Sequence, residues 1–281
     1  MIRHEVLDRT SAAAVVAEVA RWDAGTTYAP LLHTGDLGWH LRLADEVLAG
    51  TVHAWWADRG LVAVALIEGA TSRPRACPDL IGDAALAVAV ADVVDAGPHP
   101  ELWSDVVPGS ALRNELVRRG WELDPDPWVS LYASAERWEV ADRGVVRLGS
   151  AHVRARVTVQ RNGFERSTFD EPTWHRMAAG PGFRADLDLV VLDDGAPAAA
   201  ATGWLSVPGG PAILEPLATH PAHRGRGFGR AVTAAIVDAC LAAGASGVSV
   251  ATPQSNTAAV ATYVSAGFRP VETVQALTIR R

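Results

Sequence analysis

The sequence predicts an α/β fold that is built twice along the chain. Segments in which apolar residues recur every three or four positions alternate with short apolar runs bounded by turns, which predicts helices between strands. Two parts of the first half recur in the second, because residues 58–66 resemble residues 194–201 and residues 114–121 resemble residues 261–268. An internal duplication explains both resemblances most simply.

The composition indicates a soluble globular protein. Its 281 residues are 49% hydrophobic, which is ample for real cores. Cys77 and Cys240 lie far apart in apolar surroundings, so we expect neither a disulfide framework nor a cysteine-rich metal site. The first residues lack the apolar core of a signal peptide and no apolar run is long enough to cross a membrane, which predicts a cytoplasmic protein. The net charge of −7 argues against nucleic acid as the main partner.

In the first half, helical spacing, a glycine-containing turn at residues 58–60 and closing glycines define the expected elements. They are a helix over residues 12–22 with Ser11 as its N-cap, a helix over 37–49, a hairpin of strands 52–57 and 61–68, a Pro/Arg loop over 71–78, a helix over 81–96, a strand over 102–107, a helix over 110–119 and a closing strand over 128–132.

A polar segment over residues 135–142 leads into a new start at Val145, so we expect two domains, residues 1–138 and 139–281. The second half repeats the alternation of hairpin strands and helices. Its expected elements are short helices or loops over 160–182, strands over 186–192, 198–207 and 212–219, a helix over 229–243, a strand over 247–251, a helix over 256–266 and a last strand over 274–279.

A glycine-rich turn joins the strand that ends at Thr219 to the apolar helix after it. The turn reads Arg-x-x-Gly-x-Gly at Arg224, Gly227 and Gly229, and converging N–H groups at the start of a helix suit a phosphate. A P-loop needs Gly-Lys-Ser/Thr, and a dinucleotide-binding turn needs another glycine and an acidic residue about 20 positions on, and neither occurs here. Taken alone, the turn could also be a glycine-rich connection with an exposed arginine.

A second motif places Asn256, Ala259 and Tyr263 along one helix face, with Gly267 ending the helix and Phe268 starting a strand. Together, the two motifs resemble the GNAT superfamily of N-acetyltransferases. The clear resemblance covers about residues 145–279, and the duplicated plan resembles the tandem-GNAT proteins, a group that includes mycothiol synthase.

In the first half, nothing like the glycine turn stands at the matching place. When the two halves are aligned on Gly120-Trp121 and Gly267-Phe268, Gly109 and Leu116 stand where the second half has Asn256 and Tyr263. We therefore expect a degenerate N-terminal GNAT-like domain and a catalytic C-terminal GNAT domain.

The resemblance implies two tandem domains, each a mixed, mostly antiparallel sheet flanked by helices, with acetyl-CoA as co-substrate and no metal. It also implies that the strand before the turn splays from its neighbour at a bulge. Pro216 fits this arrangement, because a proline within a sheet is expected only at an edge or a bulge. The residues implied in acetyl-CoA binding are Leu217, Ala218, Thr219, Arg224, Gly225, Arg226, Gly227, Phe228, Gly229, Arg230, Asn256 and Tyr263.

Direct acyl transfer needs a base for the attacking amine and an acid for the departing thiolate. The resemblance implies Tyr263 as the acid, although a packed core tyrosine is the alternative. Glu215 on the splayed strand is the candidate base, against a carboxylate that faces solvent or caps the turn. The N–H of Leu217 is the candidate to polarise the thioester carbonyl.

The acceptor side is less patterned. Trp174, Phe164 and Glu165 fall where the family binds its acceptor, which predicts an aromatic, partly acidic pocket, although Trp174 could equally pack in the core or between the halves. His220 and His223 flank Pro221, where turn or capping roles are expected rather than metal binding, since no third ligand lies nearby in sequence.

The sequence thus predicts an acetyl-CoA-dependent N-acetyltransferase that acts directly on a primary amine of a small molecule, because no cysteine near the motifs could carry an acyl group. Two alternatives remain at this point. One is a non-catalytic acyl-CoA-binding or sensor protein, and the other is an acyltransferase with another acyl donor or acceptor.

Overall fold

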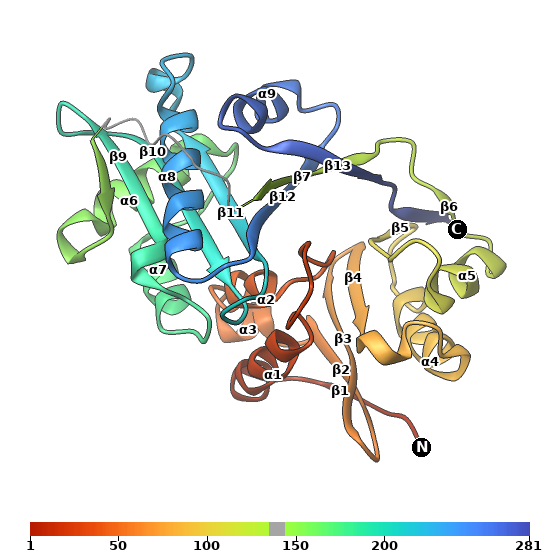
Figure 1. Ribbon diagram of the computed structural model, residues 1–281. Helices are drawn as coiled ribbons and strands as arrows, with labels where there is room; N and C mark the ends of the chain where they lie inside the picture. Colours follow the sequence, from red (N-terminus) through yellow and green to blue (C-terminus); the bar gives the residue numbers. More distant parts are fainter. Residues whose placement is uncertain (135–143) are drawn as a thin grey trace.

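The computed structural model describes residues 1–134 and 144–281, which form two sheets of seven strands each (Figure 1). The first sheet has the strand order β1 (Arg3–Val6), β2 (Val52–Ala57), β3 (Gly60–Glu68), β4 (Thr71–Ala76), β5 (Glu101–Ser104), β14 (Leu277–Arg280) and β6 (Glu122–Leu123). The second has the order β13 (Arg269–Val274), β7 (Trp128–Ser134), β12 (Gly247–Pro253), β11 (Ala212–Thr219), β10 (Ala196–Leu205), β9 (Asp188–Asp193) and β8 (Val145–Arg147).

The two sheets share one plan. Each is antiparallel except for one parallel contact, β4 with β5 in the first sheet and β11 with β12 in the second. In each parallel pair, a helix connects the first strand to the second, because parallel strands cannot be joined by a tight turn. The predicted fold class, a mixed and mostly antiparallel sheet formed twice, is confirmed.

Each half gives its late strand to the other sheet. β7 lies between β12 and β13 of the second sheet, and β14 lies between β5 and β6 of the first. The last expected strand, over residues 274–279, is therefore two strands in different sheets. The predicted domain boundary between residues 138 and 139 lies outside the described residues.

Helices cover both faces of each sheet (Figure 1). On the first sheet, α1 (Arg9–Arg21), α2 (Thr34–His40) and α3 (Asp45–Leu48) lie on one side, and α4 (Ala84–Asp95) and α5 (Ala111–Arg118) on the other. On the second, α6 (Val153–Gly163) and α7 (Glu171–Ala178) lie opposite α8 (Phe228–Ala242) and α9 (Thr257–Ser265). No helix among the described residues is long and apolar enough to cross a bilayer.

Three expectations for the first half were wrong. The N-cap of α1 is Asp8, whose side chain accepts from Ser11 N, so α1 begins earlier than Ser11 suggested. The helix expected over residues 37–49 is the two helices α2 and α3. The loop expected over residues 71–78 is mostly strand β4, because pairing with β3 outweighs the low strand propensity of its Pro/Arg sequence.

Candidate functional site

Strand β11 separates from β12 at its middle. The parallel pairing is recorded only at Ala212 and Ile213. On the other side, Leu214 pairs with Gly203 and Leu217 with Ala201, so β11 carries one extra residue, a β-bulge that contains Pro216. The splay and the bulge implied by the resemblance are both present.

The open edge of β11 presents backbone groups to the splay. His220 N donates to Ala198 O at 2.8 Å, which fixes the phase of the antiparallel ladder with β10. Hydrogen-bonded and non-hydrogen-bonded pairs alternate along such a ladder, so Leu217 and Thr219 direct their N–H and C=O groups away from β10. These N–H and C=O groups therefore face the splay between β11 and β12.

The glycine turn brings the start of α8 to the same place. Gly225 and Gly227 have φ values of +72° and +83°, a left-handed conformation that glycine adopts without strain. Gly227 is the N-cap of α8, and no side chain caps this helix start within the described chain. The first N–H groups of α8 are therefore open to an anion at the positive end of the helix dipole.

Gly229 lets three elements converge. A Cβ at this position would lie 2.9 Å from Thr219 Oγ1 at the end of β11 and 3.5 Å from Thr262 Cγ2 on α9. The start of α8, the end of β11 and α9 therefore meet with no room for a side chain at Gly229. The bare backbone at Gly229, close to two other elements, is the kind of cradle that a pyrophosphate needs.

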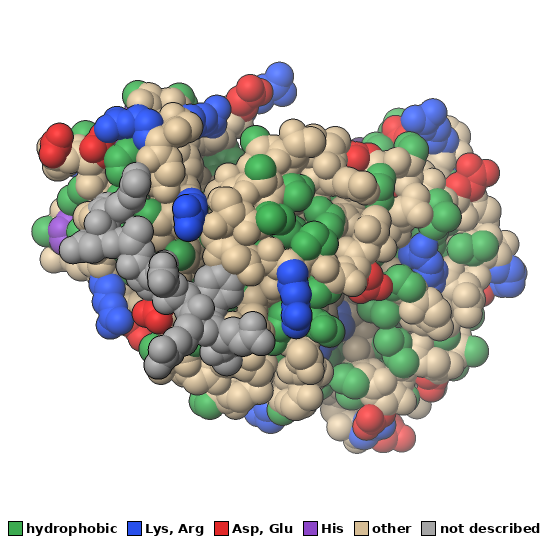
Figure 2. All heavy atoms as spheres, turned by 45° about the horizontal axis from the view of Figure 1, so that its top comes forward, with side chains coloured by type: hydrophobic (Ala, Val, Ile, Leu, Met, Phe, Trp, Pro, Cys, Tyr) green, Lys and Arg blue, Asp and Glu red, His purple; other side chains and the backbone are tan. Residues whose placement is uncertain are grey.

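The charged residues of the turn are partly engaged elsewhere. Arg224 Nη2 donates to Gly163 O at 3.0 Å, and Arg226 Nη1 lies 2.7 Å from Asp193 Oδ2. Asp193 also lies 3.0 Å from His223 Nδ1. Arg230 is exposed in the first turn of α8. Among the described residues, basic and acidic side chains are interspersed over the face that carries the starts of α8 and α9 (Figure 2).

The two histidines of the turn take the structural roles expected of them. His220 Nδ1 accepts from Ala222 N at 3.3 Å and caps the short 3₁₀ helix Pro221–His223. His223 pairs with Asp193 as described above. Both histidines therefore stabilise the backbone just before the glycine turn.

Helix α9 supplies the second motif. The side chain of Asn256 accepts from Ala259 N at 3.2 Å and forms the N-cap. Tyr263 is the buried residue of this helix and packs against Phe268, with ring centroids 5.8 Å apart. Burial, and then the nearby Glu215 carboxylate, raise the pKa of Tyr263 above its ordinary value, so the phenol stays protonated.

The carboxyl group of Glu215 lies among charged side chains of the first half. Asp36 of α2 and Arg73 of β4, whose Nη1 lies 2.5 Å from Asp36 Oδ1, both act on it electrostatically. Burial and the Asp36 carboxylate raise the pKa of Glu215 to about 8, against the opposing effects of Arg73 and Arg42. Glu215 is half-buried as a residue, and its carboxylate has raised basicity.

Helix α2 reaches Glu215 because of two glycines. A Cβ on Gly35 would lie 2.4 Å from Cβ of Trp204, and one on Gly38 would lie 2.6 Å from Cζ3 of the same residue. Trp204 also donates its indole N–H to the carbonyl oxygen of Glu215 at 2.6 Å. The glycine face of α2 therefore rests on the tryptophan that holds β11 at Glu215.

Asp36, Arg42 and Arg73 were not predicted as site residues. They belong to the half that lacks the motifs, and no spacing in the sequence links them to Glu215. Two signals were available: the glycines at positions 35 and 38, which mark a helix face that packs closely, and the arginines of the Thr71–Ala76 strand, which need acidic partners when partly buried.

The predicted acceptor residues are separated by the structure. Phe164 lines a cavity between the halves, and Glu165 is exposed. Trp174 is buried in the core and donates its indole N–H to Asp188 Oδ2 at 2.9 Å, so of its two expected arrangements it adopts the packed one. The cavity is lined by arginines and by no carboxylate of the described chain, and Glu165 lies outside its lining, so an acidic acceptor pocket stays a prediction.

A buried ion pair supports the wall of this cavity. Arg156 Nε lies 2.8 Å from Asp188 Oδ1, both side chains are fully buried, and Thr202 Oγ1 bonds to both. We expect Asp188→Asn to lower the free energy of unfolding by about 3–5 kcal/mol, because the Arg156 charge would stay buried without its partner.

Denaturant unfolding measures this effect. The matched control is Asp186→Asn, since Asp186 forms an exposed pair with Arg184 that is worth at most about 1 kcal/mol. Equal losses in both variants would show that the buried pair has no special role.

The matching places in the first half differ in their chemistry. Helix α4 is capped by Asp83, whose carboxylate accepts from Leu86 N at 2.8 Å and occupies the helix start. Leu116 is the buried residue of α5, as Tyr263 is of α9, and it has no proton to give. The residues present therefore fit a CoA pyrophosphate in the second half and not in the first.

Comparison with known proteins agrees with this geometry. Residues 156–268 match the model of the acetyltransferase (GNAT) family. The comparison with curated proteins found no match.

Solved structures show the same fold over the whole chain. A tandem GNAT protein from the clavulanic acid biosynthesis pathway is 16% identical, with a TM-score of 0.61 over 100% of this chain and 98% of its own. A GNAT-family acetyltransferase from Colwellia psychrerythraea is 12% identical, with a TM-score of 0.62 over 99% and 100%. A GCN5-related N-acetyltransferase from Sphaerobacter thermophilus is 15% identical, with a TM-score of 0.57 over 99% and 95%. The family match covers residues 156–268, and these likenesses show that the whole chain has the same fold as the tandem GNAT protein.

Proposed function

We propose that the protein transfers the acetyl group of acetyl-CoA to a primary amine of a small molecule. The observation that supports this most strongly is the convergence at one splay of the uncapped start of α8, the open edge of β11, Glu215 and Tyr263. A protein that only held acyl-CoA would need the first two of these features and not the last two.

In this proposal the cradle is formed by the N–H groups of residues 225–230, with charge added by Arg224, Arg226 and Arg230. The open edge at residues 217–219 would pair with the pantetheine arm, and Asn256 would fix the start of α9 beside it. Bound acetyl-CoA supplies the thioester whose carbonyl carbon the amine attacks. The N–H of Leu217 would donate to the carbonyl oxygen, as its direction away from β10 allows.

Proton transfer is assigned to two side chains. Glu215 takes a proton from the amine as the nitrogen–carbon bond forms, and Tyr263 gives its proton to the sulfur as the carbon–sulfur bond breaks. A pKa of about 8 makes Glu215 a better base than an ordinary glutamate. The raised pKa of Tyr263 keeps its proton in place until the thiolate forms.

Thiol release tests the proposal. The protein is incubated with acetyl-CoA and a panel of primary amines, and free CoA thiol is followed together with the acetylated amine. We expect amine-dependent release of thiol with at least one amine. Tight binding of acetyl-CoA without amine-dependent release from any amine of a broad panel would favour the binding protein.

The pH profile tests the contribution of the first half. Asp36 raises the pKa of Glu215, while Arg73 and Arg42 lower it. We expect the acid limb of the kcat/KM profile to lie near pH 8 in the wild type, because Glu215 must be ionised to act as base. Asp36→Asn removes the like charge and releases Arg73, so the limb should move to lower pH by about one unit.

The control variant is Asp83→Asn, which changes the N-cap aspartate of α4 in the same half of the chain. It should leave the pH profile unchanged. An acid limb that stays in place in Asp36→Asn would contradict the coupling between the two carboxyl groups.

A further inference from the structure

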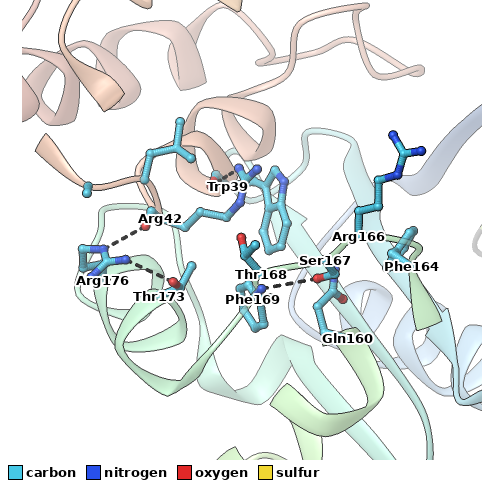
Figure 3. A pocket seen from close by; sticks show the side chains of 12 residues that line it. Trp39, Arg42, Gln160, Phe164, Arg166, Ser167, Thr168, Phe169, Thr173 and Arg176 are labelled. Atoms are coloured by element: carbon cyan, nitrogen blue, oxygen red, sulfur yellow. Dashed lines mark hydrogen bonds between the residues drawn. The ribbon is translucent and has the colours of Figure 1, made fainter. Parts of the chain in front are cut away.

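The cavity between the two halves has a composition that the proposed reaction does not explain. It measures about 420 Å³, within the size range of small-molecule sites, and residues from α2 and the segment after it face residues of α6 and α7 across it (Figure 3). Three arginines and three aromatic residues line it: Trp39, Arg42, Phe164, Arg166, Phe169 and Arg176.

These arginines have no acidic partner within ion-pair distance in the described parts of the chain. Arg42 Nη1 donates to Trp39 O at 3.0 Å, and Arg176 donates to Arg42 O at 2.9 Å and to Thr173 Oγ1 at 3.0 Å. All of these acceptors are neutral. Since the whole chain has a net charge of −7, three arginines gathered without a described carboxylate at ion-pair distance indicate a site for an anion.

The cavity lies beside the proposed base. Burial lowers the pKa of Arg42, and the carboxylates of Glu68 and Glu215 oppose this effect, so Arg42 and Glu215 are within electrostatic reach. At the other wall, α6 ends against β11, where a Cβ on Gly163 would lie 2.8 Å from Ala218 Cβ. The cavity therefore lies next to the strand that carries Glu215.

The aromatic lining suits an apolar portion of the same molecule. The Arg42 guanidinium lies 4.2 Å from the centre of the Trp39 ring, and that ring stacks on Phe169 at 5.6 Å. Phe164 remains 42% exposed. Arg166 has φ +60°, a strained backbone for a residue that is not glycine, and such strain collects at ligand sites.

We propose that this cavity binds an acid group of the acceptor, so that the acceptor is an amine that also carries a carboxylate or a phosphate. The inference rests on the proposed function and narrows its substrate class. The amine would face Glu215 while the acid group accepts hydrogen bonds from Arg42, Arg166 and Arg176.

Matched amine pairs test the inference. L-phenylalanine is compared with L-phenylalaninamide, and O-phosphoethanolamine with ethanolamine, each with acetyl-CoA at one pH. We expect kcat/KM to favour at least one acid-bearing partner by about ten- to a hundredfold, and the favoured pair distinguishes carboxylate from phosphate. Arg42→Gln and Arg166→Gln should each reduce this ratio about tenfold, whereas Arg161→Gln, an exposed position of α6 outside the cavity, should keep it.

The outcomes separate the two proposals. Acetylation of the neutral partners as fast as the acid-bearing ones, or a ratio unchanged in Arg166→Gln, overturns the inference and leaves the proposed function standing. If no amine releases thiol, the proposed function fails, and thermal unfolding with each compound decides the inference. Stabilisation by an acid-bearing amine that Arg166→Gln abolishes would support it, and equal effects of acid and neutral partners would overturn it.

Discussion

Glu215→Gln is expected to lower kcat/KM by about 10²–10⁴-fold, the range typical for loss of a general base. Glutamine fills the same space, but it cannot take a proton from the amine. Acetyl-CoA binding should persist, because the glycine turn and the open edge of β11 do not depend on this carboxylate. Initial rates and calorimetric binding of acetyl-CoA measure the two effects separately.

The control for this variant is Glu272→Gln, since Glu272 is exposed on β13. It should match the wild type in both measurements. A Glu215→Gln variant that keeps full turnover would remove Glu215 as the base and return it to the role of a buried carboxylate that anchors α2 through Asp36.

Tyr263→Phe is expected to lower kcat about 10²-fold, because the departing thiolate would have to take its proton from solvent in a closed site. The phenylalanine ring keeps the packing against Phe268, so the fold and acetyl-CoA binding should be preserved. Single-turnover thiol release measures the step directly, without product dissociation.

Tyr28→Phe provides the comparison, because Tyr28 is 50% exposed and belongs to the first half. Equal single-turnover rates in wild type and Tyr263→Phe would assign Tyr263 to packing alone, the alternative that its sequence pattern left open.

The parts of the site that sequence could predict are local in the chain. Strand β11, the glycine turn and α8 follow one another directly, and glycines stand where the turn has positive φ values, at Gly225 and Gly227. The placement of Asn256 and Tyr263 along one helix likewise follows from their spacing, although the helix begins at Thr257 with Asn256 as its N-cap. Short-range pattern and backbone sterics determine all of these features.

The parts that could not be predicted depend on contacts between distant segments. β7 and β14 are ordinary strands in sequence, and only pairing shows that each completes the other half's sheet. The surroundings of Glu215 were hidden for the same reason, since Asp36 and Arg73 reach it through the packing of α2 on Trp204. The basic lining of the cavity arises from two segments that meet only in the folded protein.

The half without the motifs therefore has a defined place in this account. In the proposed function it would close the acceptor side. Its Asp36 contributes to the raised pKa of Glu215, its Arg42 is one of the three cavity arginines, and its own helix start is capped by Asp83. We infer two folds and one reaction site in each chain.

One measurement tests this account most directly. CoA thiol and acetylated amine are quantified in the same time course, with wild type and Glu215→Gln at equal acetyl-CoA saturation. The account predicts equal amounts of the two products from the wild type, and a large parallel loss of both in the variant. Thiol released without acetylated amine, or equal rates in the two proteins, would contradict amine acetylation at the splay of β11 and β12.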